Sequence, residues 1–225
     1  MNWAPLLLSL KLAAVVTALL YVIGVPLAGW LSLSRRRWKF LVEAVVALPI
    51  VLPPTVLGYY ILVAISPQSY VGSLYLKTFG RALPFSFEGL VLASTLYSLP
   101  FAVQPFLSSF ESVDLRQSEA AWVLGASRVK TFFTVVLPAS LPGLVTGGVL
   151  SFAHTIGEFG VVLLVGGNIP GSTRVVSISI YDHVQALEYA EAGRTSLILL
   201  LFSFVILAVV YAVNRKVWAV WPKNC

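Results

Sequence analysis

Charged residues and cysteine are scarce in this sequence. Only 11% of its 225 residues are Asp, Glu, Lys or Arg, whereas 58% are hydrophobic. A soluble domain would carry about twice that charged fraction, so the composition predicts an integral membrane protein. The single cysteine, Cys225, is the last residue. It excludes a disulfide within the chain and a metal site built from several cysteines.

Motifs of nucleotide hydrolysis and of common hydrolases are also missing. No G-x-x-x-x-G-K-[S/T] loop is present, so we do not expect the chain to bind ATP in that way. There is no H-E-x-x-H and no G-x-S-x-G, and the two histidines, His154 and His183, lie far apart in the sequence. A membrane enzyme would need clustered catalytic groups within the apolar runs, which hold almost none. We therefore expect no catalytic residues, no metal site and no cofactor.

Five apolar runs are each about as long as the ~20 residues that a helix needs to cross a bilayer. They cover residues 12–33, 41–65, 89–107, 141–165 and 195–213. The basic cluster at 35–39 outweighs Lys11, so the positive-inside rule predicts an external N-terminus and a cytoplasmic C-terminus. A lipid-binding patch is the alternative interpretation of this cluster. The first run is longer than the core of a signal peptide and ends in the cluster, so we expect it to be retained.

The net charge of +6 would also fit a protein that binds nucleic acid. In the layout above, ten of the 15 Lys and Arg fall on the cytoplasmic side. Most of them lie in short loops beside apolar runs, where membrane topology accounts for them. We therefore expect membrane lipid around the chain and no nucleic-acid partner.

The second apolar run contains Pro49, Pro53 and Pro54, followed by Gly58. Proline at membrane depth frees backbone carbonyls, which is tolerated only where protein or a water-filled cavity can satisfy them. We expect this run to face the interior of the helix bundle, and a purely structural kink is the alternative. The interval 66–88 that follows is expected to be an external loop with a short interfacial helix.

The interval 166–193 is too polar and too interrupted to be a clean span. Apolar residues fall on one face of a helix at Val176, Ile180, Val184 and Leu187. This pattern predicts an external or partly re-entrant amphipathic helix. A helix that merely rests at the membrane interface is the alternative.

The fourth apolar run combines small residues with polar ones. Its first half carries Gly143, Gly147, Gly148 and Ser151. Such spacing lets helices pack with their backbones close together, within a subunit or across a dimer. We expect His154 to be packed and hydrogen-bonded rather than to bind a ligand. Glu158 is a functional candidate because an ionisable residue inside a span costs about 2.5–3.5 kcal/mol, and a structural glutamate at the external interface is the alternative.

Residues 114–142, between the third and fourth runs, carry their own helix signals. Asp114 can cap a helix, and Gln117 can complete a capping box. Gly125 can take the left-handed conformation that closes this helix. The pattern predicts a helix, a tight turn and a second helix.

The second helix should begin at Ser127, whose hydroxyl can cap it. Pro138 and Pro142 should limit it, because proline lacks the N–H that an uninterrupted helix needs. The loop should therefore be compact rather than extended.

The same interval contains Glu-Ala-Ala, then a glycine, then a hydrophobic residue followed by Leu-Pro. The residues are Glu119, Ala120, Ala121, Gly125, Val136, Leu137 and Pro138. This pattern resembles the cytoplasmic loop of ABC-importer permease subunits, which docks in a groove of a separate ATPase subunit. The resemblance implies an ATPase partner coupled through these residues. An ordinary pair of amphipathic surface helices is the alternative, since Glu and Ala are common helix formers.

Four further stretches carry a narrower resemblance. They are LPIVLPPTVLGY at 48–59, GEFG at 157–160, NIPGSTR at 168–174 and YDHVQALEY at 181–189. They are similar to stretches of molybdate ABC-importer permeases. The resemblance implies an all-α integral membrane protein with the five-helix type I permease fold and cytoplasmic coupling helices, forming one domain over residues 1–225. It also implies a homodimer in the plasma (cell inner) membrane, an ATPase and a periplasmic or extracellular molybdate-binding protein.

We expect residues at the proline and glycine breaks to form the pathway or gate for the oxyanion. They are Pro53, Pro54, Gly157, Glu158, Phe159 and Gly160. Because a carboxylate repels an oxyanion, we expect Glu158 to hold a gate or a helix end by accepting hydrogen bonds, or to pair with Arg174 or Arg194. No Lys or Arg lies in the middle of the second to fourth runs, so selectivity should rest mainly with the binding protein. Sulfate and tungstate permeases share these stretches and stay alternatives, as does a membrane scaffold without a transport role.

Overall fold

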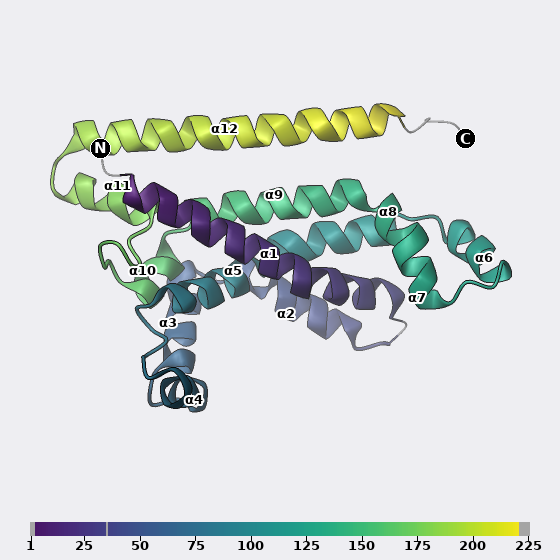
Figure 1. Ribbon diagram of the computed structural model, residues 1–225, viewed down its shortest axis with the longest axis horizontal. Helices are drawn as coiled ribbons and strands as arrows, with labels where there is room; N and C mark the ends of the chain where they lie inside the picture. The colour runs from purple at the N-terminus through teal and green to yellow at the C-terminus, as the bar shows by residue number, and fades with distance from the viewer. Residues whose placement is uncertain (1–2, 35, 221–225) are drawn as a thin grey trace.

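All regular structure in the described part of the chain, residues 3–34 and 36–220, is helical in this computed structural model (Figure 1). Within the basic cluster, Arg35 lies outside the described residues, as does Cys225. The prediction of an all-α fold is confirmed for the residues described.

Three helices pack side by side and form the centre of the molecule (Figure 1). They are α1 (Ala4–Leu33), α5 (Phe87–Glu111) and α9 (Leu141–Gly157). Phe106 of α5 is fully buried and stacks on Tyr21 of α1, with 5.3 Å between the ring centroids. The Tyr21 hydroxyl donates to the carbonyl of Leu144 in α9 over 2.8 Å. One aromatic pair therefore ties all three helices together.

The small residues of α9 let these helices approach closely, as predicted. A Cβ at Gly147 would lie 2.6 Å from the Phe106 ring and 2.9 Å from the carbonyl oxygen of Ala102. A Cβ at Gly148 would overlap Tyr21, and one at Gly143 would overlap Ser109. The glycines therefore pack against α1 and α5 of the same chain.

The expected second span is broken into α2 (Lys39–Val51) and α3 (Pro54–Ile65), which are bent by 114°. Pro53 and Pro54 have no N–H to continue the helix, and each restricts the residue before it. Pro49 is buried, but Pro53 and Pro54 are exposed on the isolated chain. The expectation that this whole run faces the interior was therefore wrong for the single chain.

The expected fourth span is also interrupted. Its first helix, α9, ends at Gly157, and the short α10 (Gly160–Gly166) follows after Glu158 and Phe159. The chain bends here because Glu158 takes an extended conformation, with φ −70° and ψ 137°. Two expected spans thus contain breaks, and α10 packs against α3.

Shorter helices lie around these breaks, and one long helix follows them. The predicted helix of the 66–88 loop is α4 (Tyr70–Phe79), which Ser69 caps. The last helix, α12 (Tyr189–Val220), runs along the outside against α9 and α11 (Val176–Gln185) (Figure 1). Its apolar side chains are largely exposed between residues 197 and 209, as expected of a helix that contacts lipid.

The buried face of α11 differs from the prediction. Val176 is buried and Ile180 packs partly buried against the same cluster, as predicted, but Ile178 is also buried and Val184 is 41% exposed. Leu187 lies beyond the end of the helix, with a positive φ of 61°. The first turns of α11 are the buried part of this helix, and α11 packs against α1 and α9, so its buried positions do not form one continuous helical stripe.

Three described helices are long and apolar enough to cross a membrane by themselves: α1, α5 and the 189–209 part of α12. Two further pairs of helices could each form one bent span: α2 with α3, and Arg128–Ala139 with α9. Counting each pair as one span gives five spans in the described residues. The expected runs 12–33 and 89–107 lie within single helices. The orientation of the termini stays a prediction.

The tight contact at Gly147 predicts that Gly147→Ala lowers the free energy of unfolding by about 1–2 kcal/mol. Overpacking against Phe106 costs about 1–3 kcal/mol, and the better helix propensity of alanine offsets up to about 1. Thermal unfolding in detergent, followed by tryptophan fluorescence, measures the change.

Gly193→Ala is the matched control, because Gly193 is an exposed helical glycine with open space around its Cβ position. It should leave the stability unchanged or slightly raised. Equal melting temperatures for the two variants would contradict close packing at Gly147.

Candidate functional site: a cavity at two helix breaks

Glu158 holds the beginning of α10. Its carboxylate accepts hydrogen bonds from the backbone N–H groups of Val161, at 2.6 Å, and Val162, at 3.0 Å. The side chain is buried, and its residue is only 5% exposed. These two N–H groups belong to the first turn of a helix and have no partner within it. Glu158 therefore makes the hydrogen bonds expected of a carboxylate that holds a helix end.

The cation partners proposed for Glu158 were wrong. Arg174 pairs with Asp182 at 3.5 Å, and Arg194 pairs with Glu191 at 2.9 Å. The backbone carbonyl of Glu158 accepts a further bond from the Ser177 hydroxyl of α11 at 2.6 Å. Within the described residues, Glu158 forms no ion pair, and hydrogen bonds fix both its side chain and its backbone.

An open cavity of about 570 Å³ lies where the two helix breaks meet. Its lining residues are Pro54, Thr55, Tyr97, Ala153, His154, Gly157, Glu158, Phe159 and Gly160. No lysine or arginine is among them. A cavity of this size can hold a small hydrated ion, and its lining offers hydroxyl, imidazole and carboxylate groups without a fixed positive charge.

Most of the predicted pathway residues come together at this cavity. Pro54, Gly157, Glu158, Phe159 and Gly160 line it, whereas Pro53 is exposed next to Pro54 and is not in the lining. Gly160 is needed for the close approach of the breaks, because a Cβ there would lie 2.8 Å from the Pro54 side chain.

Three polar residues were not singled out from the sequence. Thr55 and Tyr97 line the cavity, and Ser98 bonds to the histidine beside it. Thr55 stands in the apolar second run, and Tyr97 and Ser98 stand in the apolar third run; their polarity within these runs was the available signal. His154 itself is packed as predicted, with its ring stacked on Phe101 at 3.9 Å between centroids and its Nδ1 3.0 Å from the Ser98 hydroxyl.

The loop between the third and fourth runs forms a second site at the opposite end of the molecule from α10 and α11 (Figure 1). Its first helix is α6 (Leu115–Val123), and the Asp114 carboxylate accepts from the Arg116 N–H at 2.9 Å. Among the described hydrogen bonds, none joins the Gln117 side chain to the backbone N–H of Asp114. The second half of the capping box is therefore missing. Gly125 has the predicted left-handed conformation, with φ 84°.

The second helix of this loop begins as predicted, because the Ser127 hydroxyl accepts from the Lys130 N–H at 3.2 Å. It runs through α7 (Arg128–Thr131), a π-helical segment (Phe132–Val136) and α8 (Leu137–Ala139). It therefore ends between Pro138 and Pro142 rather than at Pro138. Pro138 sits in the first turn after the π-helical segment, where its missing N–H is tolerated.

The predicted coupling residues lie together on this loop, and most of them are open to contact. Glu119, Ala120, Gly125 and Pro138 are exposed, and Ala121 and Leu137 are partly buried. The carboxylate of Glu119 forms no ion pair with any residue that the structure describes. Val123 and Leu124 are each 87% exposed. The loop thus presents an unpaired carboxylate and apolar side chains on one protruding end.

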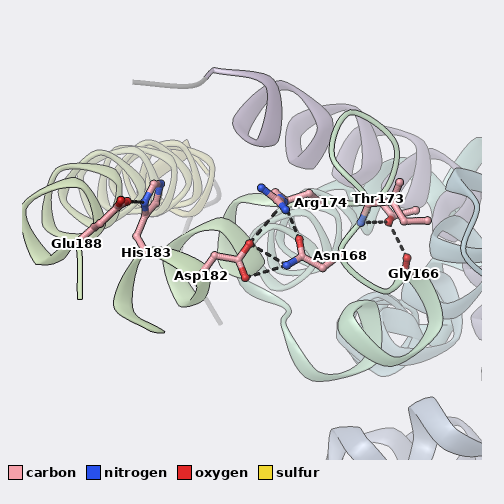
Figure 2. Close-up of polar contacts among 8 residues, drawn as sticks. Gly166, Asn168, Thr173, Arg174, Asp182, His183 and Glu188 are labelled. Carbon is pink, nitrogen blue, oxygen red and sulfur yellow. Dashed lines mark hydrogen bonds and ion pairs between the residues drawn. The ribbon is translucent and has the colours of Figure 1, made fainter. Parts of the chain in front are cut away.

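The polar loop 166–174 is fixed to α11 by a network of side chains, shown in Figure 2. The Asn168 amide nitrogen lies 2.8 Å from both Asp182 oxygens, and its oxygen accepts from Arg174 Nε at 2.6 Å. The Thr173 hydroxyl donates to the carbonyl of Gly166 at 2.6 Å. Asn168 and Arg174 therefore hold the NIPGSTR stretch against Asp182 of α11, and the Thr173 hydroxyl ties the stretch to the end of α10. The sequence did not reveal the pairing of Asn168 with Asp182.

Comparison with known proteins gives related transport proteins along most of the chain. The family described as "Binding-protein-dependent transport system inner membrane component" matches residues 12–219. The chain is 50% identical over 212 residues to the "Molybdenum transport system permease protein ModB" of Azotobacter vinelandii, covering 94% of both chains. It is 38% identical over 184 residues to the protein of the same name from Escherichia coli (strain K12), covering 82% of this chain and 80% of that protein.

Solved structures of ABC-transporter chains have the same fold at low sequence identity. A chain of the MetNI methionine ABC transporter, in inward-facing conformations, superposes with a TM-score of 0.73 at 17% identity, covering 96% of this chain and 97% of that one. A chain of a bacterial ABC transporter involved in the import of the acidic polysaccharide alginate gives 0.70 at 16% identity, covering 96% and 80%. The predicted type I ABC-importer permease fold is therefore confirmed. The chain belongs to the family of binding-protein-dependent transport system inner membrane components.

Proposed function

We propose that this chain is the membrane permease subunit of an ATP-driven importer of molybdate. The main support for the proposal is that this chain is 50% identical in sequence to a molybdenum transport permease, over 94% of both chains. The absence of lysine and arginine from the cavity lining fits a path that lets an oxyanion pass without trapping it. Selectivity would then rest with an external molybdate-binding protein.

The cavity at the two helix breaks forms half of the proposed pathway. It is open, and it lies on a face where Pro53, Pro54 and Thr55 are exposed on the single chain. A second copy that covers this face would enclose a path between the two subunits and bury these residues. A homodimer thus accounts for exposed prolines in a run that was expected to face a bundle interior.

The protruding loop at the other end is the proposed contact with the ATPase. Glu119 offers an unpaired carboxylate, Ala120 lets a partner approach the backbone, and Val123 and Leu124 supply exposed apolar area. Closure of an ATPase dimer on ATP binding would move the paired loops and turn the pathway outward, and hydrolysis would reset it. Because α6 is cytoplasmic in this scheme, α11 and the Asn168 network lie on the external side, toward the binding protein.

A sulfate importer is the second candidate. The chain is 35% identical over 209 residues to a "Probable sulfate transport system permease protein cysT" of Zygnema circumcarinatum, covering 93% of this chain and 71% of that protein. Sulfate is also a tetrahedral oxyanion, so the chemistry of the cavity does not separate the two substrates.

Uptake into liposomes tests the proposal. We expect ATP-dependent accumulation of labelled molybdate when the chain is reconstituted with its ATPase and its binding protein, and we expect this uptake to persist in excess sulfate. Suppression by sulfate would favour the second candidate. Absence of uptake for both anions would contradict the importer.

Variants of the protruding loop test its contact with the ATPase. Gly125→Pro cannot adopt the observed φ of 84°, because proline fixes φ near about −65°. We expect this variant, and Ala120→Trp, to lose most of the ATPase that co-purifies with the chain and at least tenfold of the uptake.

Gly80→Ala is a control for the loss of a positive-φ glycine, because Gly80 (φ 70°) lies after α4, away from the loop. It should retain the ATPase. A scaffold without a transport role predicts that function is unchanged in all of these variants.

The hydrogen bonds of Glu158 predict the effect of Glu158→Gln. A carboxamide has one acceptor oxygen, so one of the two N–H groups of α10 loses its partner, which costs about 1–3 kcal/mol. We expect a lower melting temperature and reduced molybdate uptake, with the ATPase still bound.

Glu191→Gln is the matched control, because Glu191 forms only a surface ion pair with Arg194, and such pairs contribute little. Normal stability and uptake of Glu158→Gln would show that the charge of Glu158 has no role.

A further inference from the structure

A chain of three polar contacts connects α5 and α9 beside the cavity. His154 Nδ1 lies 3.0 Å from the Ser98 hydroxyl oxygen. The same oxygen lies 3.0 Å from the hydroxyl oxygen of Thr155. The Thr155 hydroxyl in turn donates to the backbone carbonyl of Ser151 at 2.8 Å. Ser98, Thr155 and Ser151 are buried, so these contacts are shielded from water.

Only one arrangement of protons satisfies all three contacts. The carbonyl of Ser151 can only accept, so the single hydroxyl proton of Thr155 points to it. Thr155 must then accept from Ser98, which uses the one proton of Ser98. Ser98 must therefore accept from His154, and Nδ1 carries the proton. Each group thus donates to the next: His154 to Ser98, Ser98 to Thr155, and Thr155 to the carbonyl of Ser151.

The second nitrogen of the ring, Nε2, is the one left to face the cavity, because Nδ1 is bonded to Ser98. His154 lines the cavity, and Nε2 has no hydrogen-bond partner in the described part of the chain. The buried side-chain polar atoms without a partner in the described residues are Thr17 Oγ1 and Ser94 Oγ, so Nε2 is not sealed inside the protein. It is the ring nitrogen that a solute or a water molecule in the cavity can reach.

The groups facing the imidazole supply no positive charge. Phe101 stacks on the ring, and the Tyr97 ring lies 4.8 Å from it between centroids. The titratable groups that line the cavity with His154 are Tyr97 from α5 and Glu158 at the end of α9. The lining residues from α3, Pro54 and Thr55, do not titrate at physiological pH. The contact that His154 makes with an anion therefore depends on the proton state of Nε2.

We propose that Ser98 keeps a proton on Nδ1 of His154, so that the neutral ring has its lone pair at Nε2, on the cavity through which the oxyanion would pass. This inference rests on the proposed function. A fully deprotonated tetrahedral oxyanion has only acceptor oxygens, so a lone pair cannot bind it directly. Nε2 accepts instead from a water molecule of the anion's hydration shell. His154 is thus a pathway residue that guides a hydrated anion without retaining it, and Ser98 is its positioning residue.

Nitrogen-15 NMR of the histidine-labelled chain, reconstituted in lipid at neutral pH, tests the tautomer. His183→Gln removes the signal of the second histidine. We expect the pattern of a neutral ring with a protonated Nδ1 and an unprotonated Nε2. In Ser98→Ala the ratio of tautomers should shift about fivefold toward Nε2–H, the value of one neutral hydrogen bond of about 1 kcal/mol. Ser98→Thr keeps a hydroxyl and should restore the original pattern.

An Nε2–H ring or an imidazolium in the unchanged Ser98 protein would overturn the proposal, as would a Ser98→Ala spectrum identical to that of the parent chain. This measurement needs no transport, so its outcome is independent of the proposed function.

Uptake measurements test the consequence for transport. In Ser98→Ala, a donor at Nε2 would hold the anion in the cavity, so uptake at saturating molybdate should fall about fivefold and recover in Ser98→Thr. The amount of bound ATPase should not change. A shifted tautomer with unchanged uptake would refute the role of Nε2 in the pathway, whereas absence of uptake with the unchanged chain would contradict the proposed function instead.

Discussion

The need to satisfy backbone polar groups where helices break inside a membrane governs this structure. An unpaired N–H or carbonyl costs several kcal/mol in hydrocarbon, so breaks persist only where side chains or water can bind these groups. At the break between α9 and α10, Glu158 bonds to two N–H groups, and Ser177 bonds to the Glu158 carbonyl. At the break between α2 and α3, Pro53 and Pro54 have no N–H group that needs a partner, and the N–H groups of Val56 and Leu57 donate to the Pro53 carbonyl. The two breaks meet at one cavity, which places the proposed pathway where the helices are interrupted.

The uninterrupted helices supply the rigidity that these breaks require. Helices α1, α5 and α9 pack closely, because Phe106 stacks on Tyr21 and the glycines of α9 leave room for both neighbours. The same three-helix core separates a protruding loop at one end from the Asn168 network at the other (Figure 1). Movement of that loop could reach the cavity through α9, because the π-helical segment and α8 lead directly into it. This continuity gives a physical route by which an event at the loop can reach the helix break.

The sequence predicted the features that depend on local chemistry. The caps at Asp114 and Ser127, the left-handed Gly125 and the close packing of the α9 glycines follow from residue type and spacing. It did not predict the angle of the α2–α3 bend or the partners of Glu158, since these depend on which segments meet in space. The exposure of Pro53 and Pro54 was misjudged because it depends on which segments cover the α2–α3 break, and no local pattern gives this. The Asn168–Asp182 contact joins a loop to a helix and has no signal in either segment alone.

Thiol labelling can measure directly whether the cavity carries water and changes its exposure with ATP. A single cysteine at Thr55, in a chain whose Cys225 is replaced by serine, would report on the lining, and a cysteine at the exposed Leu200 of α12 would report on the lipid face. We predict that a charged, water-soluble thiol reagent labels Thr55→Cys, that ATP changes the labelling rate, and that labelling blocks uptake, while Leu200→Cys stays unreactive. Equal and low reactivity at both positions would show that the cavity is not part of the pathway.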